Sequence, residues 1–526
     1  MVLASRAIDE EKPTEARALV AEAERLLAET ADPRIASQVR ANLGALMIDL
    51  AELQLDNDLL RRGTELTRRA LSEIPERDLT PSHFYNAANG HYALWQSGGH
   101  VAIREGRMDP SYLLAKEYYR KALDLLRARP GDAEPRLHQQ ILVNYGNCLS
   151  SQGRVAEAVE RYEQALRLNP SMPEALGNKA IVLHRYAHLS QGFTHLFLLE
   201  AARLFSEALT HPLFSPMART FKEHLDDVNR QIAAHEAMEP EHISREQPRS
   251  PFHRFLRDYC AHHRLYLNLT TFTGQKEHLV HGDPLFIRHM SAPINDNDKF
   301  DRYVTFLNQI KHDYVLGRYF LVQSQYRSET VEAIDEGVAL YYPLDYSLDS
   351  AYIQFLKASI RYALGVLDKI ANFVRDYCKV NLKDKDVYFT NLWSMNKSPL
   401  LMRQELASKR NVFLWGLFDL ALDLRKGGYY LSIVEQRHAL THRFVVVHDM
   451  LLSDQTNKDI PRIRLSDFRG QCILATQIAR SAVIYLILMV DVQERVEDAG
   501  RPSLPIVGTP IDDRLRWRPD SGDVTI

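Results

Sequence analysis

Apolar residues recur every three or four positions through most of the second half of the chain. This spacing predicts amphipathic helices, because positions three and four apart lie on one face of an α-helix. Five such segments are expected, at residues 300–325, 351–380, 412–424, 431–450 and 468–492. Short turn-like joints such as Gly427-Gly428 separate some of them, which favours a helical bundle over residues 252–499.

The last of these segments is apolar on nearly every side, which is typical of a helix at the centre of a bundle. Its most apolar run, residues 482–490, is far shorter than the ~20 residues that a membrane span requires. We therefore expect a buried helix and no membrane partner.

A different pattern occupies residues 144–170, where small, aromatic and proline residues fall at fixed spacings. Gly146 and Ala158 are small enough for two helices to cross closely, and Tyr162 fills the space beside them. Pro170 ends the second helix, because its ring cannot continue the hydrogen-bond ladder. This segment resembles a tetratricopeptide repeat (TPR), a helix-turn-helix unit of ~34 residues.

Weaker copies flank this repeat. The pattern of its second helix recurs at Ala201, Phe205 and Ala208, at Ala115, Tyr119 and Ala122, and in degenerate form at Gly63, Thr67 and Ala70. Such repeats stack into a curved solenoid, which we expect over residues 1–236. The resemblance implies a concave groove that binds a protein or peptide. A scaffold without a specific ligand is the alternative.

Two segments lack an apolar period. Residues 237–251 are charged and contain prolines, so we expect a linker there. Residues 500–526 combine prolines with scattered charges, and we expect a loosely structured tail. The fold class predicted is therefore all-α: an irregular TPR-like solenoid followed by a helical bundle.

The composition describes an ordinary globular protein, with 526 residues, 45% hydrophobic and 25% charged. A net charge of −3 gives no overall basic field that would indicate a nucleic-acid partner. The four cysteines are far apart and form no Cys-x-x-Cys pair, and the charged N-terminus offers no signal peptide, so we expect a cytoplasmic protein. Glycine-rich phosphate loops are absent, and no cofactor is expected.

Candidate chemistry is concentrated late in the chain, at Arg437, His438 and His442. An arginine supplies a permanent cation and a histidine supplies a group that titrates near neutral pH. Phosphodiester cleavage without a metal requires both. The spacing alone is weak evidence, because Arg-x4-His occurs five times in this chain.

The surrounding sequence separates this copy from the other four. The second half resembles a HEPN domain, and more narrowly a bacterial branch of HEPN proteins that often carries TPRs upstream. The resemblance covers about residues 251–495 and depends on blocks that occur in the expected order: FLNQIK (306–311), LDYS (344–347), FLKASIRY (355–362), LDKIANF (367–373) and RHALTH (437–442).

HEPN ribonucleases cut RNA without a metal, by attack of the ribose 2′-hydroxyl on the adjacent phosphate. The resemblance implies that His442 is the acid/base group, that Arg437 stabilises the transition state and that His438 orients His442 or shares its proton. Residues five apart on a helix differ by about 140° in direction. The family resolves this by pairing two copies of the motif, so a homodimer through the bundle is expected.

Other interpretations stay open. Lys357, Arg361 and Lys369 share one predicted helix with Asp368, and either contact RNA or stabilise the bundle. His438 and His442 also have the spacing of zinc ligands, and Arg437 is alternatively a structural residue paired with a neighbouring helix.

The function expected from the sequence is an endoribonuclease gated by a TPR sensor, in stress response or anti-phage defence. The alternative is a non-catalytic dimeric adaptor or RNA-binding scaffold.

Overall fold

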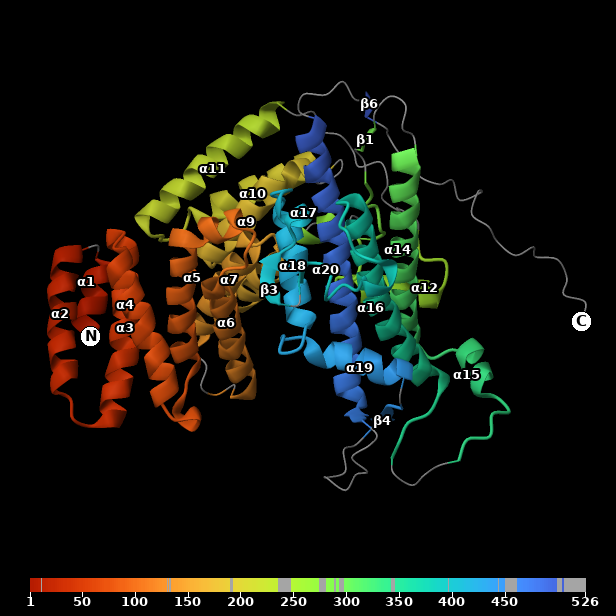
Figure 1. Cartoon of the computed structure of the whole chain (residues 1–526), viewed down its shortest axis with the longest axis horizontal. Helices are drawn as coiled ribbons and strands as arrows, with labels where there is room; N and C mark the ends of the chain where they lie inside the picture. Colours follow the sequence, from red (N-terminus) through yellow and green to blue (C-terminus); the bar gives the residue numbers. More distant parts are fainter. Residues whose placement is uncertain are drawn as a thin grey trace, which may run out of the picture.

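The computed structural model is mostly helical and confirms the all-α class (Figure 1). It describes residues 1–10, 12–129, 131, 134–189, 193–234, 247–273, 281–287, 290–292, 298–341, 346–395, 397–442, 444–449, 461–498 and 504–505.

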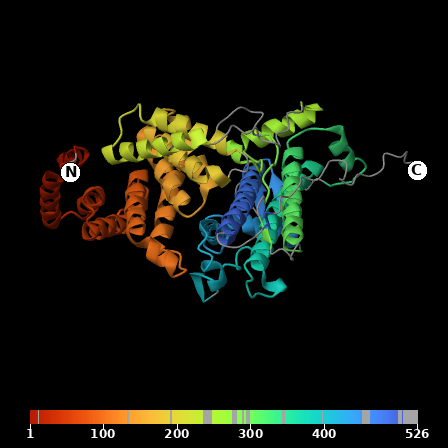
Figure 2. The same cartoon turned by 90° about the horizontal axis from the view of Figure 1, so that it is seen from above.

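The N-terminal part is a series of helices in which each packs against the next. The series comprises α1 (Val2–Asp9), α2 (Pro13–Glu29), α3 (Pro33–Gln54), α4 (Asn57–Glu73), α5 (Pro81–Arg104), α6 (Pro110–Ala128), α7 (Pro135–Ser151), α8 (Val155–Leu168), α9 (Pro173–Tyr186), α10 (Thr194–Ala208) and α11 (Ser215–Ala234), with short 3-10 turns η1 (Glu76–Asp78) and η3 (Ala187–Leu189). Figure 2 shows the same succession from above, running from the N-terminus toward the second part of the molecule.

Local sequence sets where these helices begin. Proline opens α2, α3, α5, α6, α7 and α9, at a position where its missing N–H costs nothing. The side chains of Asp32, Asp56 and Asp109 accept hydrogen bonds from the first backbone N–H groups of α3, α4 and α6.

Small residues let the paired helices cross closely, as the repeat pattern predicts. A Cβ atom placed on Gly44 would lie 2.8 Å from the carbonyl oxygen of Gly63 in the next helix. A Cβ on Gly146 would lie 2.6 Å from a ring carbon of Tyr162. Any larger residue at these points would push the paired helices apart. The close helix crossings that the sequence predicts at Gly63 and Gly146 are therefore confirmed.

The C-terminal part is a bundle around one long central helix. Its elements are α12 (Pro251–His262), η4 (Leu269–Phe272), α14 (Asp298–Gln323), α15 (Glu329–Asp335), α16 (Ala351–Tyr377), η5 (Asp384–Asp386), α17 (Gln404–Ala407), α18 (Val412–Leu424), α19 (Leu431–His442) and α20 (Leu465–Asp498). The central helix α20 packs against α14, α16 and α18.

Short paired strands lie in the segments between and after these helices. β1 (Ser291–Ala292) pairs antiparallel with β6 (Leu504–Pro505), β2 (Ser394–Met395) pairs antiparallel with β3 (Ser398–Met402), and β4 (Val446–His448) pairs parallel with β5 (Arg462–Arg464).

The predicted helix over residues 431–450 is wrong at residues 444–449. The helix α19 ends at His442, and β4 follows. The reason is local: the run Phe444-Val445-Val446-Val447 is aromatic and β-branched, which favours an extended backbone. The strand is held on both sides, because Val446 N–H donates to the Pro461 carbonyl (3.0 Å) and Leu348 N–H donates to the Val447 carbonyl (2.8 Å).

Among the described residues, one helical segment, Leu465–Val496 of α20, is long and apolar enough to cross a membrane, with a mean hydropathy of 1.9 in its most apolar window. In the structure 83% of that window is buried inside the protein. The segment therefore has the surroundings expected of a core helix. Most of the predicted linker at 237–251 and tail at 500–526 lies outside the described residues, and these two boundaries stay predictions.

Candidate functional site

The helix that carries the candidate residues, α19, packs against α16 and α18 at one end of the bundle (Figure 1). A tight turn connects it to α18: Gly427 has a positive φ of 82°, and Tyr430 N–H donates to the Asp423 carbonyl (2.7 Å). A Cβ on Gly428 would lie 2.4 Å from that same carbonyl oxygen. The direction of α19 is thus fixed by backbone contacts with the end of α18.

Arg437 is partly exposed and is oriented by α16. Its Nη1 donates to Asp368 Oδ2 at 2.8 Å, and Asp368 Oδ1 accepts the backbone N–H of Phe389 at 3.0 Å. The Arg437 side chain is 37% exposed. The ion pair with a neighbouring helix, which a structural role for Arg437 would require, is therefore present. The guanidinium still reaches the surface.

His438 is exposed on the same helix, whereas His442 forms the end of α19. The His442 side chain lies outside the described part of the structure, so its place beside Arg437 stays a prediction. Within the part that is described, no group of three or more His, Cys, Asp or Glu side chains could hold a metal ion.

The three residues predicted to contact RNA all lie on α16, and Arg361 and Lys369 make polar contacts within the bundle. Arg361 donates to the Leu440 carbonyl in the last turn of α19. Lys369 pairs with Asp313 of α14 at 2.5 Å. Burial lowers the pKa of Lys357. Arg361 therefore supports the helix end next to His442, and RNA contact by the three cations stays a prediction.

A hollow of about 180 Å³ lies beside Arg437, between α16, α18 and α19. Its wall includes Asp368 and Arg437, and the segment Tyr388-Phe389-Thr390 closes one side. Sequence reasoning missed this segment, because it contains no spacing or residue type that marks a site.

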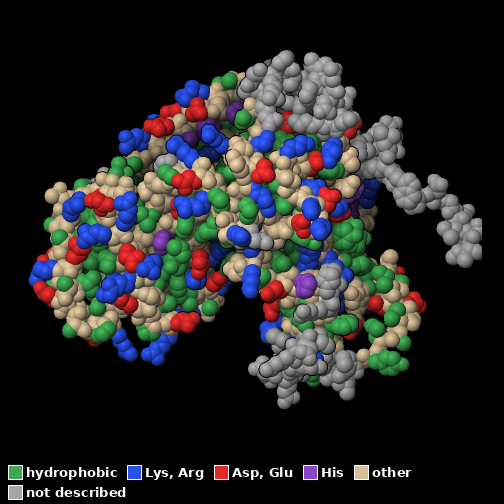
Figure 3. Space-filling view, in the orientation of Figure 1, with side chains coloured by type: hydrophobic (Ala, Val, Ile, Leu, Met, Phe, Trp, Pro, Cys, Tyr) green, Lys and Arg blue, Asp and Glu red, His purple; other side chains and the backbone are tan. Residues whose placement is uncertain are grey.

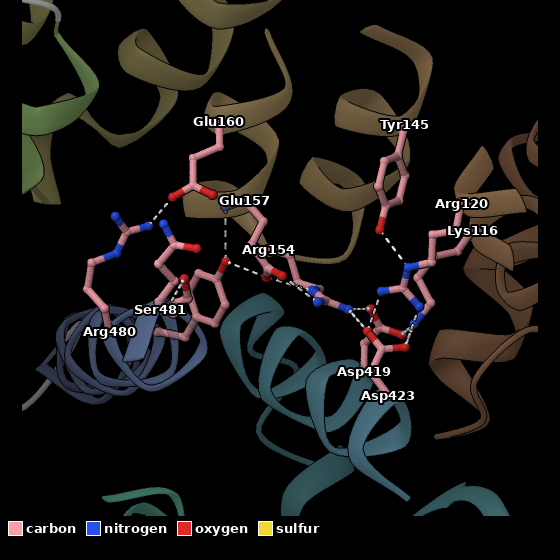
Figure 4. Close-up of polar contacts among 12 residues, drawn as sticks. Lys116, Arg120, Tyr145, Arg154, Glu157, Glu160, Asp419, Asp423, Arg480 and Ser481 are labelled. Carbon is pink, nitrogen blue, oxygen red and sulfur yellow. Dashed lines mark hydrogen bonds and ion pairs between the residues drawn. The ribbon is translucent and has the colours of Figure 1, made fainter. Parts of the chain in front are cut away.

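A buried charged cluster joins the solenoid to α18 (Figure 4). We call it the interdomain ion cluster, and it consists of Lys116, Arg120, Arg154, Glu157, Asp419 and Asp423. Its three cations, all from α6 and the start of α8, balance three carboxylates, two of them from α18. Every member is at least about nine-tenths buried.

The charged groups of the interdomain ion cluster lie within hydrogen-bonding distance of one another. Arg154 Nη1 lies 2.7 Å from Asp419 Oδ2, Lys116 Nζ lies 2.9 Å from Asp423 Oδ1, and Arg120 Nη1 lies 2.7 Å from the same oxygen. Burial alone would raise the pKa of Asp423, but the charges of Arg120, Lys116 and Arg154 outweigh it and hold the pKa well below its ordinary value. Asp423 is therefore ionised throughout the neutral range.

The solenoid helix α6 also contacts the turn that precedes α19. The guanidinium of Arg120 lies 4.4 Å from the ring centre of Tyr429, and the Tyr429 hydroxyl donates to Asp124 at 3.0 Å. Tyr430 N–H is hydrogen-bonded to the Asp423 carbonyl, and the Asp423 carboxylate pairs with Arg120 of α6. A short series of contacts therefore links α6 to α19. In the orientation of Figure 3 the surface is hollowed between the solenoid and this end of the bundle, with basic and acidic side chains intermixed on the solenoid.

The two parts also meet backbone to backbone. Gly153, with a φ of 78°, lies against Val412 at the start of α18, and a Cβ there would be 2.4 Å from the Val412 carbonyl oxygen. We expect Gly153→Ala to lower the free energy of unfolding by about 2–4 kcal/mol, from left-handed strain and overpacking. Urea unfolding followed by circular dichroism measures this.

The matched control is Gly365→Ala in α16, where the added Cβ would have no atom within 4 Å outside its own turn of helix. It should stabilise the protein by about 0.5–1 kcal/mol, because alanine is preferred within a helix. Equal effects of the two substitutions would contradict the close contact at Gly153.

Comparison with known proteins agrees with this architecture. Residues 294–493 match the family described as LA2681-like HEPN, and residues 146–185 match a TPR repeat. The chain is also similar to the photosystem I assembly protein Ycf3 of Rippkaea orientalis (strain PCC 8801 / RF-1), with 37% identity over 87 residues. That alignment covers 16% of this chain and 47% of the relative, so the chain spans about half the length of the protein it matches.

Proposed function

Because the chain joins a TPR solenoid to an LA2681-like HEPN domain, we propose that it is a metal-independent endoribonuclease controlled by the solenoid. The observation that carries the proposal is the placement of Arg437 and His438 at the surface of α19, inside the segment that matches the HEPN family. The substrate is RNA, and the proposed place of action is the cytoplasm, in stress response or defence against phage.

The proposed reaction needs no group beyond these side chains. The ribose 2′-hydroxyl attacks the adjacent phosphorus, the bond to O5′ breaks, and the products carry 2′,3′-cyclic phosphate and 5′-hydroxyl ends. His442 takes or returns the proton, and His438 orients it or shares the proton. Arg437 stabilises the negative charge that builds on the phosphate oxygens, and its bond to Asp368 holds it in position.

A homodimer through the HEPN domain completes the proposed site. Residues five apart on α19 point in directions about 140° apart, so one helix does not place Arg437 and His442 on the same side. A two-fold axis beside α19 would bring two copies of the helix to one cleft.

Control by the solenoid follows from the contacts between the two parts. A protein or peptide that binds the solenoid groove and shifts α6 would move Arg120 against Tyr429 and Asp423. These residues fix the beginning of α19, so the shift would reach the helix that carries Arg437. The ligand changes activity to the extent that it binds the two arrangements with different affinity.

The test is incubation of the full-length protein with mixed RNA in EDTA, followed by analysis of the RNA ends. We expect fragments with 2′,3′-cyclic phosphate and 5′-hydroxyl ends. Cleavage that disappears with the chelator would contradict the proposal. If the purified protein is inactive for lack of its ligand, expression in cells should still be toxic, and toxicity should require Arg437 and His442.

One observation favours the alternative, a non-catalytic dimeric adaptor. Arg437 makes a well-formed ion pair with Asp368, as a structural arginine would. An adaptor would bind RNA or protein and leave RNA intact, and its expression would not be toxic. The two functions therefore differ in both assays.

A further inference from the structure

The hollow beside Arg437 has the form of a binding site for a flat ring. Leu364 and Leu367 of α16 and Leu424 of α18 form an apolar wall, and each is buried. Tyr388 also lines the hollow and is 53% exposed, so this residue is accessible from solvent. An exposed aromatic next to an apolar wall is the surface on which unstacked nucleobases bind.

The segment that carries Tyr388 is held in place before any ligand arrives. Tyr388 N–H donates to the Asn391 side chain at 2.8 Å, and Phe389 N–H donates to Asp368 at 3.0 Å. Trp393 Nε1 donates to the Phe389 carbonyl at 2.6 Å, and Arg425 donates to the Thr390 carbonyl. A preformed wall lowers the entropic cost of binding.

The size and polarity of the hollow limit the kind of ligand that it can bind. At about 180 Å³, the hollow is smaller than the ~300 Å³ at which pockets begin to enclose whole drug-sized ligands, so it suits one ring system. The carboxylate of Asp368 forms part of the wall and has about four acceptor positions, of which the bonds to Arg437 and Phe389 use two. It can therefore accept a hydrogen bond from the amino group of a base.

We propose that this hollow binds one base of the substrate RNA, next to the phosphate that Arg437 contacts, and so determines where the strand is cut. The inference rests on the proposed function, because it takes RNA as the ligand of the Arg437 site. Tyr388 stacks on the base, Asp368 contacts its edge, and the ribose-phosphate backbone leaves the hollow beside Arg437. Tyr388 and Asp368 are thus specificity residues.

The test uses binding without cleavage. A short fluorescent oligonucleotide with 2′-O-methyl riboses has no attacking hydroxyl, and its affinity for the full-length protein is measured by anisotropy. We expect Tyr388→Ala to weaken binding about tenfold, in the range found when an aromatic that stacks on a base is removed. Thr390→Phe, which places a bulky ring in the lining of the hollow, should weaken binding to a similar extent.

The matched control is Tyr341→Ala, which removes a tyrosine that is 94% exposed and does not line the hollow. It should leave the affinity unchanged. The same oligonucleotide with a single abasic site, moved through each position, then identifies the base: at one position the effect of Tyr388→Ala should disappear.

Each result decides the inference. No binding by the wild-type protein, equal affinities for wild type and Tyr388→Ala, or a Tyr388 effect that persists at every abasic position would overturn it. Tyr388-dependent binding of nucleoside monophosphates without binding of the oligonucleotide would overturn it as well, since the occupant would then be a free nucleotide. Tyr388-dependent binding to one base, with RNA left uncut and no toxicity on expression in cells, would support the base site and count against the nuclease. Cleavage whose rate and position are unaffected by Tyr388→Ala would support the nuclease and count against the base site.

Discussion

Alanine at Arg437 is expected to slow RNA cleavage in EDTA by about 10²–10³-fold, the usual effect of losing one group that stabilises a transition-state charge. Alanine at His442 should slow it by about 10²–10⁴-fold, the range for a general acid or base. Both substitutions should leave the fold intact. The Arg437–Asp368 pair is partly exposed, and such pairs contribute no more than about 1 kcal/mol.

The measurement is the initial rate of cleavage of one RNA by each variant, with circular dichroism to confirm folding. The chain provides its own control, because Arg219 and His224 of α11 have the same spacing as Arg437 and His442. Arg219→Ala should cleave at the wild-type rate. Folded Arg437→Ala and His442→Ala proteins that still cut RNA at full speed would rule out these roles.

Alanine at Asp423 is expected to cost about 3–5 kcal/mol of stability, the usual loss when one partner of a buried ion pair is removed. The substitution leaves Lys116, Arg120 and Arg154 buried with one carboxylate fewer, and a buried cation without its partner is costly. Denaturant unfolding, followed by circular dichroism and by limited proteolysis between the two parts, measures the loss.

The control for Asp423 is Asp58→Ala, which removes a carboxylate whose side chain is 89% exposed and paired with Arg61. Its effect should be within about 0.5 kcal/mol, as for other surface substitutions. Similar losses for Asp423→Ala and Asp58→Ala would mean that the interdomain ion cluster does not hold the solenoid against the bundle. The proposed control of α19 through α6 would then lose its physical basis.

The sequence predicts the helices well because their spacing records buried faces directly. Gly146 and Tyr162 predict a close crossing, and the structure places one against the other. The same reasoning fails after His442, because an apolar run such as Val445-Val446-Val447 satisfies a helical period as well as a strand. Branching at the β-carbon was the distinguishing feature.

The interdomain ion cluster was missed for a different reason. Lys116 and Arg120 lie four residues apart, and so do Asp419 and Asp423; each pair alone resembles a solvated helix face. Only the tertiary fold places one pair opposite the other. Asp419 and Asp423 did carry a usable sign, since they are the acidic residues of an otherwise apolar helix, α18.

The central claim concerns which atom attacks the phosphate, and one substrate tests it. Once a cut site is mapped, the full-length protein is incubated in EDTA with that RNA and with a copy that has a single 2′-deoxyribose on the 5′ side of the scissile phosphate. We predict that cleavage stops at this position and continues elsewhere. Cleavage that continues at the deoxyribose would show that the 2′-hydroxyl is not the nucleophile and would contradict the assignment of Arg437 and His442.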